Sequence, residues 1–366
     1  MALRWLAATI TAVAALLASS GVTPAEAHTH HRSLRVMTWN LYLGADLEPA
    51  LRAPNPEAFL AAVASIYATS QANDFDARAD AIAKEIKTKR PDLVGLQEVS
   101  RWETSGAVTH APSEEDFLTV LQQKLTARGL NYAVASVSTN ATVGPLPLIS
   151  PCRSTTPGAC LITFTDRDVV LVNSETRRLS WWNPQHGNFA AQLSFTPPLS
   201  EAQEVSFNRG WASIDGQFRG RRFHFVTTHL ETSGFPEVQQ AQAAELLAGP
   251  AFGPGADLVV GDINSAPDDS TRPTYALLTG QLRDAWTVRR KQPGYTCCQA
   301  ERLDNPTSQL SRRIDVILTR RARPVAAKVV GDRTIAATPP LWPSDHAGVV
   351  ADLILRSRVQ PELPLS

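Results

Sequence analysis

The chain has 366 residues, 43% of them hydrophobic and 19% charged, and its 35 basic and 35 acidic residues give a formal net charge of zero. This is the composition of a globular protein, long enough to bury a large core. A zero net charge excludes a large basic field that would draw nucleic acid from a distance.

The N-terminal residues have the three parts of a secretory signal peptide. Arg4 supplies a positive charge, Leu6 to Leu17 forms an apolar run, and the small-residue pattern Ala25-Glu26-Ala27 follows. We therefore expect cleavage after Ala27 and a secreted protein. The apolar run is too short for a transmembrane helix and no later run reaches that length, so no stable membrane span is expected. Retention of the segment as an anchor is the alternative.

The remaining chain is predicted to form one mixed α/β domain, 34–356, between a disordered histidine-rich tail, 28–33, and a C-terminal tail, 357–366. Apolar periodicity predicts helices at 56–68, 74–90, 238–247 and 275–278, and a further helix that opens at Ser113 close to a capping Asp116. Short apolar runs between turn residues predict strands at 34–39, 93–96, 132–137, 161–164, 169–172, 211–214, 223–228, 258–260, 314–318, 326–330 and 349–355. No internal repeat or long linker divides this domain, and a monomer is expected.

Four cysteines, in an exported protein, are expected to form disulfides. They permit three full pairings. We favour Cys152 with Cys160, which closes a loop rich in Pro, Gly, Ser and Thr, and the adjacent Cys297 with Cys298. A cross-link between the two segments is the rival arrangement. Neither pair has the ligand spacing that is usual for a zinc site.

The stretch from Asp257 to Asp269 is an apolar strand that stops at an acid, an amide and a turn. After Leu258 to Val260, Gly261 allows close backbone approach, and Asp262 and Asn264 follow two residues apart. If the chain is still extended there, both side chains point to the same side of the sheet. The alternative is a solvated Asx turn before Pro267, in which Asp268 and Asp269 are also turn residues.

Other predicted strands end in the same way. Asn40, Glu98 and His229 each lie at or just beyond an apolar run, and Ser344-Asp345-His346 precedes the last strand. Asp315 lies between Ile314 and Val316, where an ionised carboxylate is costly to bury unless it is paired. His346 is its expected partner. Taken singly, each of these residues also has an ordinary interpretation as a turn, a cap or a core residue, and their joint occurrence favours a site.

A divalent cation and a histidine would suit this set of side chains. Mg²⁺ takes oxygen ligands, usually one or two protein carboxylates together with water and substrate phosphate. Glu98 and Asp345 offer carboxylates, and Asn40 offers a neutral oxygen. A histidine held by a carboxylate can act as a base or carry positive charge toward a phosphoryl group.

Six of these segments resemble, in the same order, the motifs of the endonuclease/exonuclease/phosphatase superfamily, which includes deoxyribonuclease I, abasic-site endonucleases, neutral sphingomyelinases and inositol-polyphosphate 5-phosphatases. The segments are Thr38-Trp39-Asn40, Leu96-Gln97-Glu98, Thr228-His229-Leu230, Gly261-Asp262-Ile263-Asn264, Arg313-Ile314-Asp315 and Ser344-Asp345-His346. The resemblance covers residues 34–355. It implies an α+β fold, a four-layer α/β/β/α sandwich of two mixed β-sheets as in deoxyribonuclease I, with the site at one edge.

The resemblance also implies a role for each motif residue. Glu98 is the principal metal ligand, Asn40 and Asp345 lie in or beside its shell, and the metal is Mg²⁺, with Mn²⁺ or Ca²⁺ as alternatives. Asp262 orients or deprotonates the attacking water, and Asn264 holds a phosphate oxygen. His346 stabilises the developing charge with Asp315 behind it, and His229 binds the phosphate or assists the leaving group. Arg209, at the start of a predicted strand, is a further candidate phosphate contact.

The motifs predict a metal-dependent phosphoric ester hydrolase but leave three substrate classes open. The first is nucleic acid, whose backbone phosphates would be contacted by three basic clusters, although solvated turns are the more usual role of such clusters. The clusters are Arg219, Arg221, Arg222; Arg289, Arg290, Lys291; and Arg320, Arg321, Arg323. The second is a phospholipid headgroup, as in sphingomyelinase or phospholipase C, with Trp181-Trp182 at the lipid interface; at least one of these is expected in the core. The third is a phosphomonoester on a small polyanion such as an inositol phosphate. A non-catalytic binding module is disfavoured because every motif residue is present.

Overall fold

The structure, a computed structural model, describes residues 33–108, 113–156, 158–199, 204–269, 273–289, 292–335 and 340–356. The signal peptide predicted at 1–27, nearly all of the tail at 28–33 and the tail at 357–366 lie outside these residues. Among the helices that the structure does describe, none combines the length and the apolar character needed to cross a membrane.

The first sheet has eight strands in the order β15-β16-β1-β2-β6-β3-β4, with β5 paired to β6. Its strands are β1 (Leu34–Asn40), β2 (Leu93–Gln97), β3 (Arg101–Gly106), β4 (Glu114–Asp116), β5 (Tyr132–Pro147), β6 (Cys160–Asn173), β15 (Ala322–Val330) and β16 (Gly348–Leu355). The neighbours β1 and β2 are parallel, and Asn40 pairs with Gln97 at their ends. Asn40 and the residue after Gln97 therefore leave the sheet at the same edge.

The second sheet has six strands in the order β13-β14-β12-β11-β10-β7. They are β7 (Leu179–Asn188), β10 (Gly210–Phe218), β11 (Arg221–His229), β12 (Ala256–Asp262), β13 (Arg283–Asp284) and β14 (Asp315–Arg320), and β8 (Leu193–Phe195) pairs separately with β9 (Val205–Phe207). The parallel pair β11 and β12 ends with His229 opposite Asp262, and antiparallel β14 places Asp315 opposite Asp262. Three predicted site residues thus stand side by side at one register.

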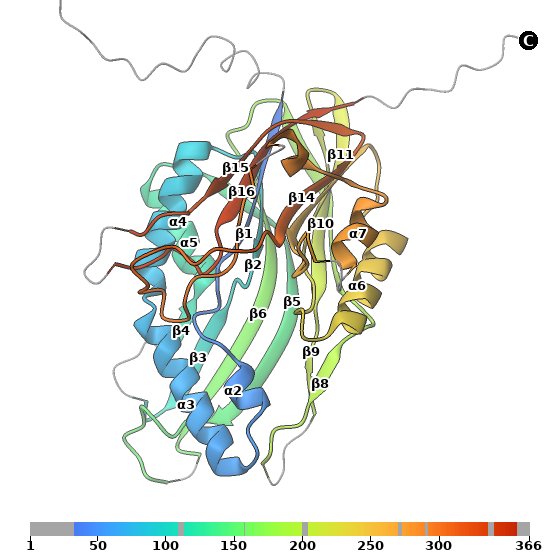
Figure 1. The fold of residues 1–366 in the computed structure, drawn as a ribbon. Helices are drawn as coiled ribbons and strands as arrows, with labels where there is room; N and C mark the ends of the chain where they lie inside the picture. Colours follow the sequence, from blue (N-terminus) through green and yellow to red (C-terminus); the bar gives the residue numbers. More distant parts are fainter. Residues whose placement is uncertain are drawn as a thin grey trace, which may run out of the picture. The chain divides into compact units, whose positions relative to one another are not determined.

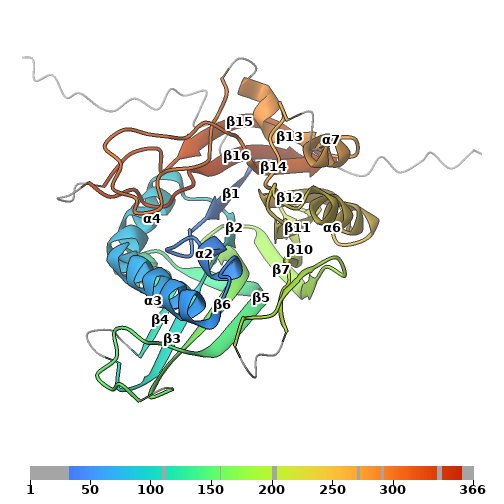
Figure 2. The same cartoon turned by 60° about the horizontal axis from the view of Figure 1, so that its bottom comes forward.

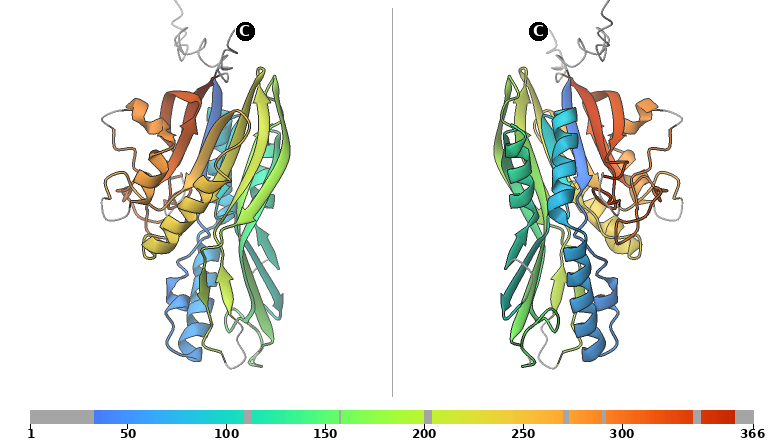
Figure 3. Two further views of the ribbon diagram at one scale, coloured as in Figure 1. Left: turned by 90° about the vertical axis from the view of Figure 1, so that its right-hand side faces the viewer. Right: turned by 90° about the vertical axis from the view of Figure 1, so that its left-hand side faces the viewer.

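Helices cover the outer face of each sheet (Figures 1 and 2). The helices are α2 (Glu48–Leu51), α3 (Pro56–Ala72), α4 (Phe75–Lys89), α5 (Phe117–Ala127), α6 (Pro236–Ala248), α7 (Thr274–Thr279) and the 3-10 helix η1 (Ala285–Arg289). The buried faces of α3, α4 and α5 pack on the first sheet, those of α6 and α7 pack on the second, and a third apolar cluster lies between the sheets. The side views in Figure 3 show the resulting layers. The predicted four-layer α/β/β/α sandwich is confirmed.

The two sheets approach each other closely just behind the edge where Asn40 and Asp262 lie. A Cβ atom added to Gly95 on β2 would stand 2.5 Å from Cγ2 of Val260 on β12 and 2.7 Å from Oγ1 of Thr227 on β11. Gln97 donates a hydrogen bond from Nε2 to Thr227 Oγ1 at 2.7 Å. The absence of a side chain at Gly95 and the buried hydrogen bond between Gln97 and Thr227 therefore set the distance between the two sheets at this point.

Two predicted boundaries differ from the structure. The helix expected to open at Ser113 begins at Phe117, because Glu114–Asp116 pairs with β3 and the Asp116 side chain then accepts hydrogen bonds from the amides of Leu118 and Thr119. Strands 161–164 and 169–172 are one continuous strand, β6. The polar residues 165–168 between them looked like a turn, yet they stay in the ladder with β5.

Substitution of Gly261 tests whether β12 requires the close approach of its backbone to β11. Its φ is +149°, and an added Cβ atom would overlap the carbonyl oxygen of Thr228 on β11. We expect Gly261→Ala to lower the free energy of unfolding by on the order of 2 kcal/mol or more, measured by urea denaturation. Gly129→Ala is the matched control, because Gly129 also has a positive φ of +72° but nothing within 4 Å of the added atom. Equal losses in the two variants would rule out the proposed overlap.

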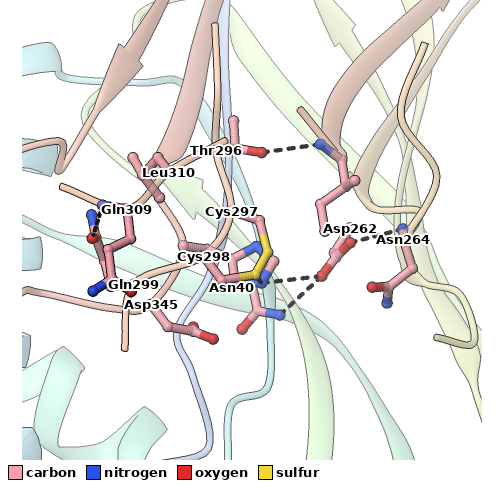
Figure 4. Close-up of a disulfide and its surroundings, with 12 residues drawn as sticks. Asn40, Asp262, Asn264, Thr296, Cys297, Cys298, Gln299, Gln309, Leu310 and Asp345 are labelled. Carbon is pink, nitrogen blue, oxygen red and sulfur yellow. Dashed lines mark hydrogen bonds and ion pairs between the residues drawn. A yellow bond between two sulfur atoms is a disulfide. The ribbon is translucent and has the colours of Figure 1, made fainter. Parts of the chain in front are cut away.

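Both expected disulfides are present. Cys152 is bonded to Cys160 and Cys297 to Cys298. The cross-link between the two segments is therefore the wrong alternative. The Cys297–Cys298 bridge lies at the edge of the sandwich beside Asn40 and Asp262 (Figure 4).

Candidate active site

The carboxyl ends of β1, β2, β11 and β12 and the segment before β16 meet at one edge of the sandwich. All nine predicted site residues gather there: Asn40, Glu98, Arg209, His229, Asp262, Asn264, Asp315, Asp345 and His346. Side-chain contacts link eight of them into one network centred on the Asp262 carboxylate, and the charge of Asp345 acts on Glu98 and His346.

His346 lies between two carboxylates. Its Nδ1 is 2.8 Å from Asp315 Oδ2, and its Nε2 is 3.7 Å from Asp262 Oδ2. Burial alone would lower the pKa of His346, but Asp315, Asp345 and Asp262 together raise it well above its ordinary value. These carboxylates favour the positively charged imidazole, and the buried Asp315 has the partner that was predicted.

Asn40 links the two halves of the site. Its Nδ2 donates to Glu98 Oε1 at 2.9 Å and to Asp262 Oδ2 at 3.2 Å, while its Oδ1 accepts from the amide of Tyr42 at 2.8 Å. Figure 4 shows the Asn40 amide directed toward Asp262. In this arrangement Asn40 orients the two carboxylates with its nitrogen, so its role as an oxygen ligand stays a prediction.

His229 and Asn264 occupy the opposite side of Asp262. His229 Nε2 is 3.6 Å from Asp262 Oδ2 and 3.2 Å from Asn264 Nδ2. Arg209 Nη1 lies 3.0 Å from His229 Nδ1, and its Nη2 lies 3.5 Å from the Glu231 carboxylate. Burial, followed by the nearby Arg209, holds the pKa of His229 well below its ordinary value, so this histidine is neutral.

The structure places Asn264 by a turn rather than by an extended chain. β12 ends at Asp262, Asn264 has a φ of +51°, and its amide donates to Asp262 Oδ1 at 2.9 Å. The chain is therefore not extended at Asn264, and the condition under which the two side chains would share a face is not met. Both of the alternatives considered for this stretch hold in part, because an Asx turn builds the site.

Ser344 and Trp39, which have no proposed catalytic role, hold the segment of Asp345 and His346 against β1. The Ser344 hydroxyl donates to the carbonyl of Asn40 at 2.8 Å and accepts from the amide of His346 at 3.1 Å. Trp39 Nε1 donates to the carbonyl of His346 at 3.0 Å. These bonds explain why Trp39 and Ser344 accompany the reactive side chains in the sequence.

Sequence reasoning missed three groups close to the site. Asp166 and Asp168 are buried on β6, and Asp166 contributes to the raised pKa of Glu98. Glu231 pairs with Arg209. Cys298 Sγ lies 3.9 Å from His346 Nε2. Two acids at positions i and i+2 inside an apolar strand were the available signal, since both side chains then face the same buried side.

Glu98 and Asp345 offer neighbouring carboxylates, the kind of oxygen donor that a divalent cation takes. Burial, followed by the charges of Asp345 and Asp166, raises the pKa of Glu98 to about 7. Arg78 is the nearby cation, but its guanidinium already donates to the carbonyls of Asn73, Leu41, Tyr42 and Pro343. Among the described residues, Asn40 donates to Glu98 Oε1 and the amide of Leu43 donates to Glu98 Oε2. Two neighbouring carboxylates with few other hydrogen-bond partners are the kind of oxygen donors that Mg²⁺ prefers.

Comparisons with known proteins identify the family of this chain. Residues 37–346 match the model of the Endonuclease/Exonuclease/phosphatase family, and a comparison with curated proteins finds no significant match. Among solved structures, an endonuclease/exonuclease/phosphatase from Beutenbergia cavernae DSM 12333 is 22% identical with a TM-score of 0.53, covering 89% of this chain and 72% of that one.

Two further solved structures share the fold at lower identity. A family protein from Bacteroides thetaiotaomicron is 17% identical, with a TM-score of 0.52 and coverage of 88% of this chain and 95% of that one. D. rerio TDP2 complexed with single strand DNA product is 15% identical, with a TM-score of 0.51 and coverage of 88% and 98%. Because the family model spans most of the chain, this protein belongs to the endonuclease/exonuclease/phosphatase family, whose members are generally phosphoric ester hydrolases.

Proposed function

We propose that the protein is a secreted, divalent-metal-dependent phosphodiesterase that hydrolyses phosphodiester bonds of nucleic acid by attack of an activated water. The observation that carries this proposal is the position of the Asp262 carboxylate, 3.6 Å from His229 Nε2 and 3.7 Å from His346 Nε2. A base flanked by one neutral and one charged imidazole can accept a proton from water while positive charge faces the phosphoryl group.

The side chains divide the chemistry among them. Burial and the charge of Asp315 raise the pKa of Asp262 to about 6, which suits a base that works near neutral pH. His346⁺, oriented by Asp315, stabilises the charge that develops on the phosphoryl oxygens. Asn264 and Arg209 hold the phosphate, and His229 lies between them. A cation held by Glu98 and Asp345, with Asn40 beside it, would supply Lewis-acid polarisation of a phosphoryl oxygen.

Three observations support a secreted enzyme with a nucleic-acid substrate. The N-terminal 27 residues have the composition of a signal peptide, and two disulfides suit an oxidising compartment. The fold is shared with D. rerio TDP2, whose structure is described as a complex with single strand DNA product. This likeness supports the substrate class by analogy of fold.

A phospholipid phosphodiesterase is the second candidate, and an apolar cavity favours it. The cavity has a volume of about 60 Å³ and lies between α2, α3 and the strands β3, β5 and β6, with only apolar side chains among its described lining residues. Trp102 lines it and donates from Nε1 to the carbonyl of Leu43, whose amide donates to Glu98. Of the tryptophan pair, Trp181 packs against the core and Trp182 is exposed, as expected.

The metal and the substrate are tested together. The purified protein is expected to lose all hydrolysis when a chelator is added and to regain it with Mg²⁺ or Mn²⁺. It is then assayed against duplex DNA, single-stranded DNA, RNA, sphingomyelin, phosphatidylcholine and inositol phosphates. We expect single-stranded or duplex DNA to be the best substrate. Hydrolysis that survives the chelator contradicts the metal assignment, whereas metal-dependent hydrolysis of lipid alone selects the second candidate.

A further inference from the structure

Two buried aspartates on β6 lie beside the catalytic edge and take no part in the proposed chemistry. Asp166 and Asp168 are two residues apart in the strand, so both side chains point to the same face of the sheet. The exposed fraction is 6% for Asp166 and 0% for Asp168. On the neighbouring strand β5 the pairing shifts between Thr139 and Ala141, and the extra residue, Asn140, donates from Nδ2 to Asp166 Oδ2 at 3.2 Å. Two acids and an amide therefore share one buried patch.

Several oxygen atoms of this patch have no hydrogen-bond donor. Among the described residues, both carboxylate oxygens of Asp168, the Oδ1 atom of Asp166 and the Oδ1 atom of Asn140 are buried without a hydrogen-bond partner. The Asn140 amide favours the ionised form of both carboxylates, but it leaves these four atoms unsatisfied. Buried acceptors are costly unless they are paired. A single water molecule has only two hydrogens to donate, so the patch calls for a partner of another kind.

The nearby arginines do not pair with these carboxylates. Arg209 acts on both of them and Arg167 on one, but Arg209 pairs with Glu231 at 3.5 Å and Arg167 pairs with Asp116 at 2.7 Å. Within the described part of the chain, no basic side chain forms an ion pair with either carboxylate. Burial outweighs the two arginines and raises the pKa of both carboxyl groups. Two neighbouring buried acids of this kind can both ionise when a cation lies between them.

The patch is separate from the cation site proposed at Glu98 and Asp345. The charges of Glu98 and the two aspartates act on one another, so the two groups of oxygen atoms are neighbours. A Ca²⁺ ion with ligands at about 2.3–2.6 Å brings its ligand atoms within roughly 5 Å of one another. Glu98, Asp166 and Asp168 are not among the sets of three or more described ligand residues whose ligand atoms lie within 4.8 Å of one another. One ion therefore does not serve all three.

We propose that Asp166, Asp168 and Asn140 bind a Ca²⁺ ion at a second cation site, beside the one proposed for catalysis. Ca²⁺ takes roughly six to eight oxygen ligands from carboxylates, amide carbonyls and water, and it accepts irregular geometry, whereas Mg²⁺ usually keeps several waters. Asp168 offers both of its oxygens and Asp166 offers Oδ1. A half-turn of the Asn140 amide exchanges its nitrogen and oxygen, so that Oδ1 faces the ion. Binding at this site does not depend on the proposed hydrolysis.

The test is direct calorimetric titration of the full chain with Ca²⁺, which needs no substrate and no activity. The Asp345→Asn variant removes one ligand of the proposed catalytic cation and isolates the new site. We expect this variant to bind one Ca²⁺ ion, and the double variant Asp168→Asn/Asp345→Asn to bind it roughly a hundredfold more weakly or not at all. Absence of Ca²⁺ binding in Asp345→Asn overturns the inference, and so does binding that survives the loss of Asp168.

The matched control is Asp215→Asn, added to the same Asp345→Asn background. Asp215 is also a buried aspartate of the sandwich, but its carboxylate already contacts His224 at 2.8 Å and accepts from Asn183 at 2.8 Å. Ca²⁺ binding is expected to be unchanged by this substitution. Equal weakening by Asp215→Asn and Asp168→Asn would show a general effect of losing a buried acid and would contradict the site.

Thermal unfolding separates a cation ligand from a residue that only supports the fold. In a chelator, Asp168→Asn is expected to unfold at the same temperature as the parent Asp345→Asn chain or at a higher one, because one of two neighbouring buried charges is removed. Added Ca²⁺ should raise the unfolding temperature of the parent and leave that of the double variant unchanged. An unfolding temperature lowered by Asp168→Asn to the same extent with and without Ca²⁺ would show a structural role alone and overturn the proposal.

Discussion

Replacing Asp262 with asparagine is expected to lower kcat by roughly a hundredfold or more while KM changes little. The substitution keeps the size of the side chain and its place between His229 and His346, but it removes the group that accepts the proton from water. Loss of one group that acts mainly in the transition state typically has this effect. Steady-state kinetics at saturating Mg²⁺ on the best substrate measures it.

Asp268→Asn is the control for this variant. Asp268 follows the same strand and carries the same charge, but it is exposed beyond Pro267. Its kcat is expected to stay within about twofold of the original, since exposed charges far from the reacting atoms contribute little. If Asp262→Asn retains near-normal kcat with an unchanged circular dichroism spectrum, Asp262 is not the base.

Removal of the charged imidazole is expected to have an effect of similar size. His346→Ala should lower kcat by roughly a hundredfold, because the positive charge facing the phosphoryl group is lost. Asp315→Asn should also lower kcat, because Asp315 is the carboxylate that orients His346 through the 2.8 Å contact at Nδ1. His186→Ala, at an exposed position of β7, is the control and should be neutral.

The double variant Asp315→Asn/His346→Ala shows whether Asp315 acts by positioning His346 or contributes independently. If Asp315 acts only through His346, the double variant should be about as slow as His346→Ala alone. Independent roles would multiply the two losses. A multiplied loss would therefore contradict the assignment of Asp315 as the residue that orients His346.

The meeting of the motif residues at one edge could be predicted because its signals are local. Each motif residue follows a short apolar run, and parallel neighbours such as β1 with β2 bring their carboxyl ends together wherever the strands are placed. Burial of the Asp315 carboxylate without a partner is energetically costly, and this cost alone predicted a partner. His346, in the next polar segment, was the candidate. These inferences needed no knowledge of the angle or distance between the sheets.

The details that escaped prediction depend on contacts distant in sequence. Residues 165–168 looked like a turn because Asp166 and Asp168 interrupt an apolar run, yet Asn140 on β5 donates to Asp166 at 3.2 Å and keeps the strand intact. β7 was missed because it is mostly exposed and polar, and its pairing with β10 makes it a strand. The turn at Asn264 could be given only as one of two alternatives, because an Asp-x-Asn pattern suits both an extended chain and an Asx turn.

The close approach of the sheets at Gly95 has a consequence for how activity is lost. Glu98 follows a strand of one sheet and Asp262 ends a strand of the other, and Asn40 donates a hydrogen bond to each of their side chains. The distance between the Glu98 and Asp262 carboxylates therefore depends on the separation of the two sheets. The close contact of Gly95 with Val260 and Thr227, just behind this edge, sets that separation. Heat, pressure or an added methyl group that moves the two sheets apart by a fraction of an ångström at this point would abolish the proposed hydrolysis while both sheets remained folded.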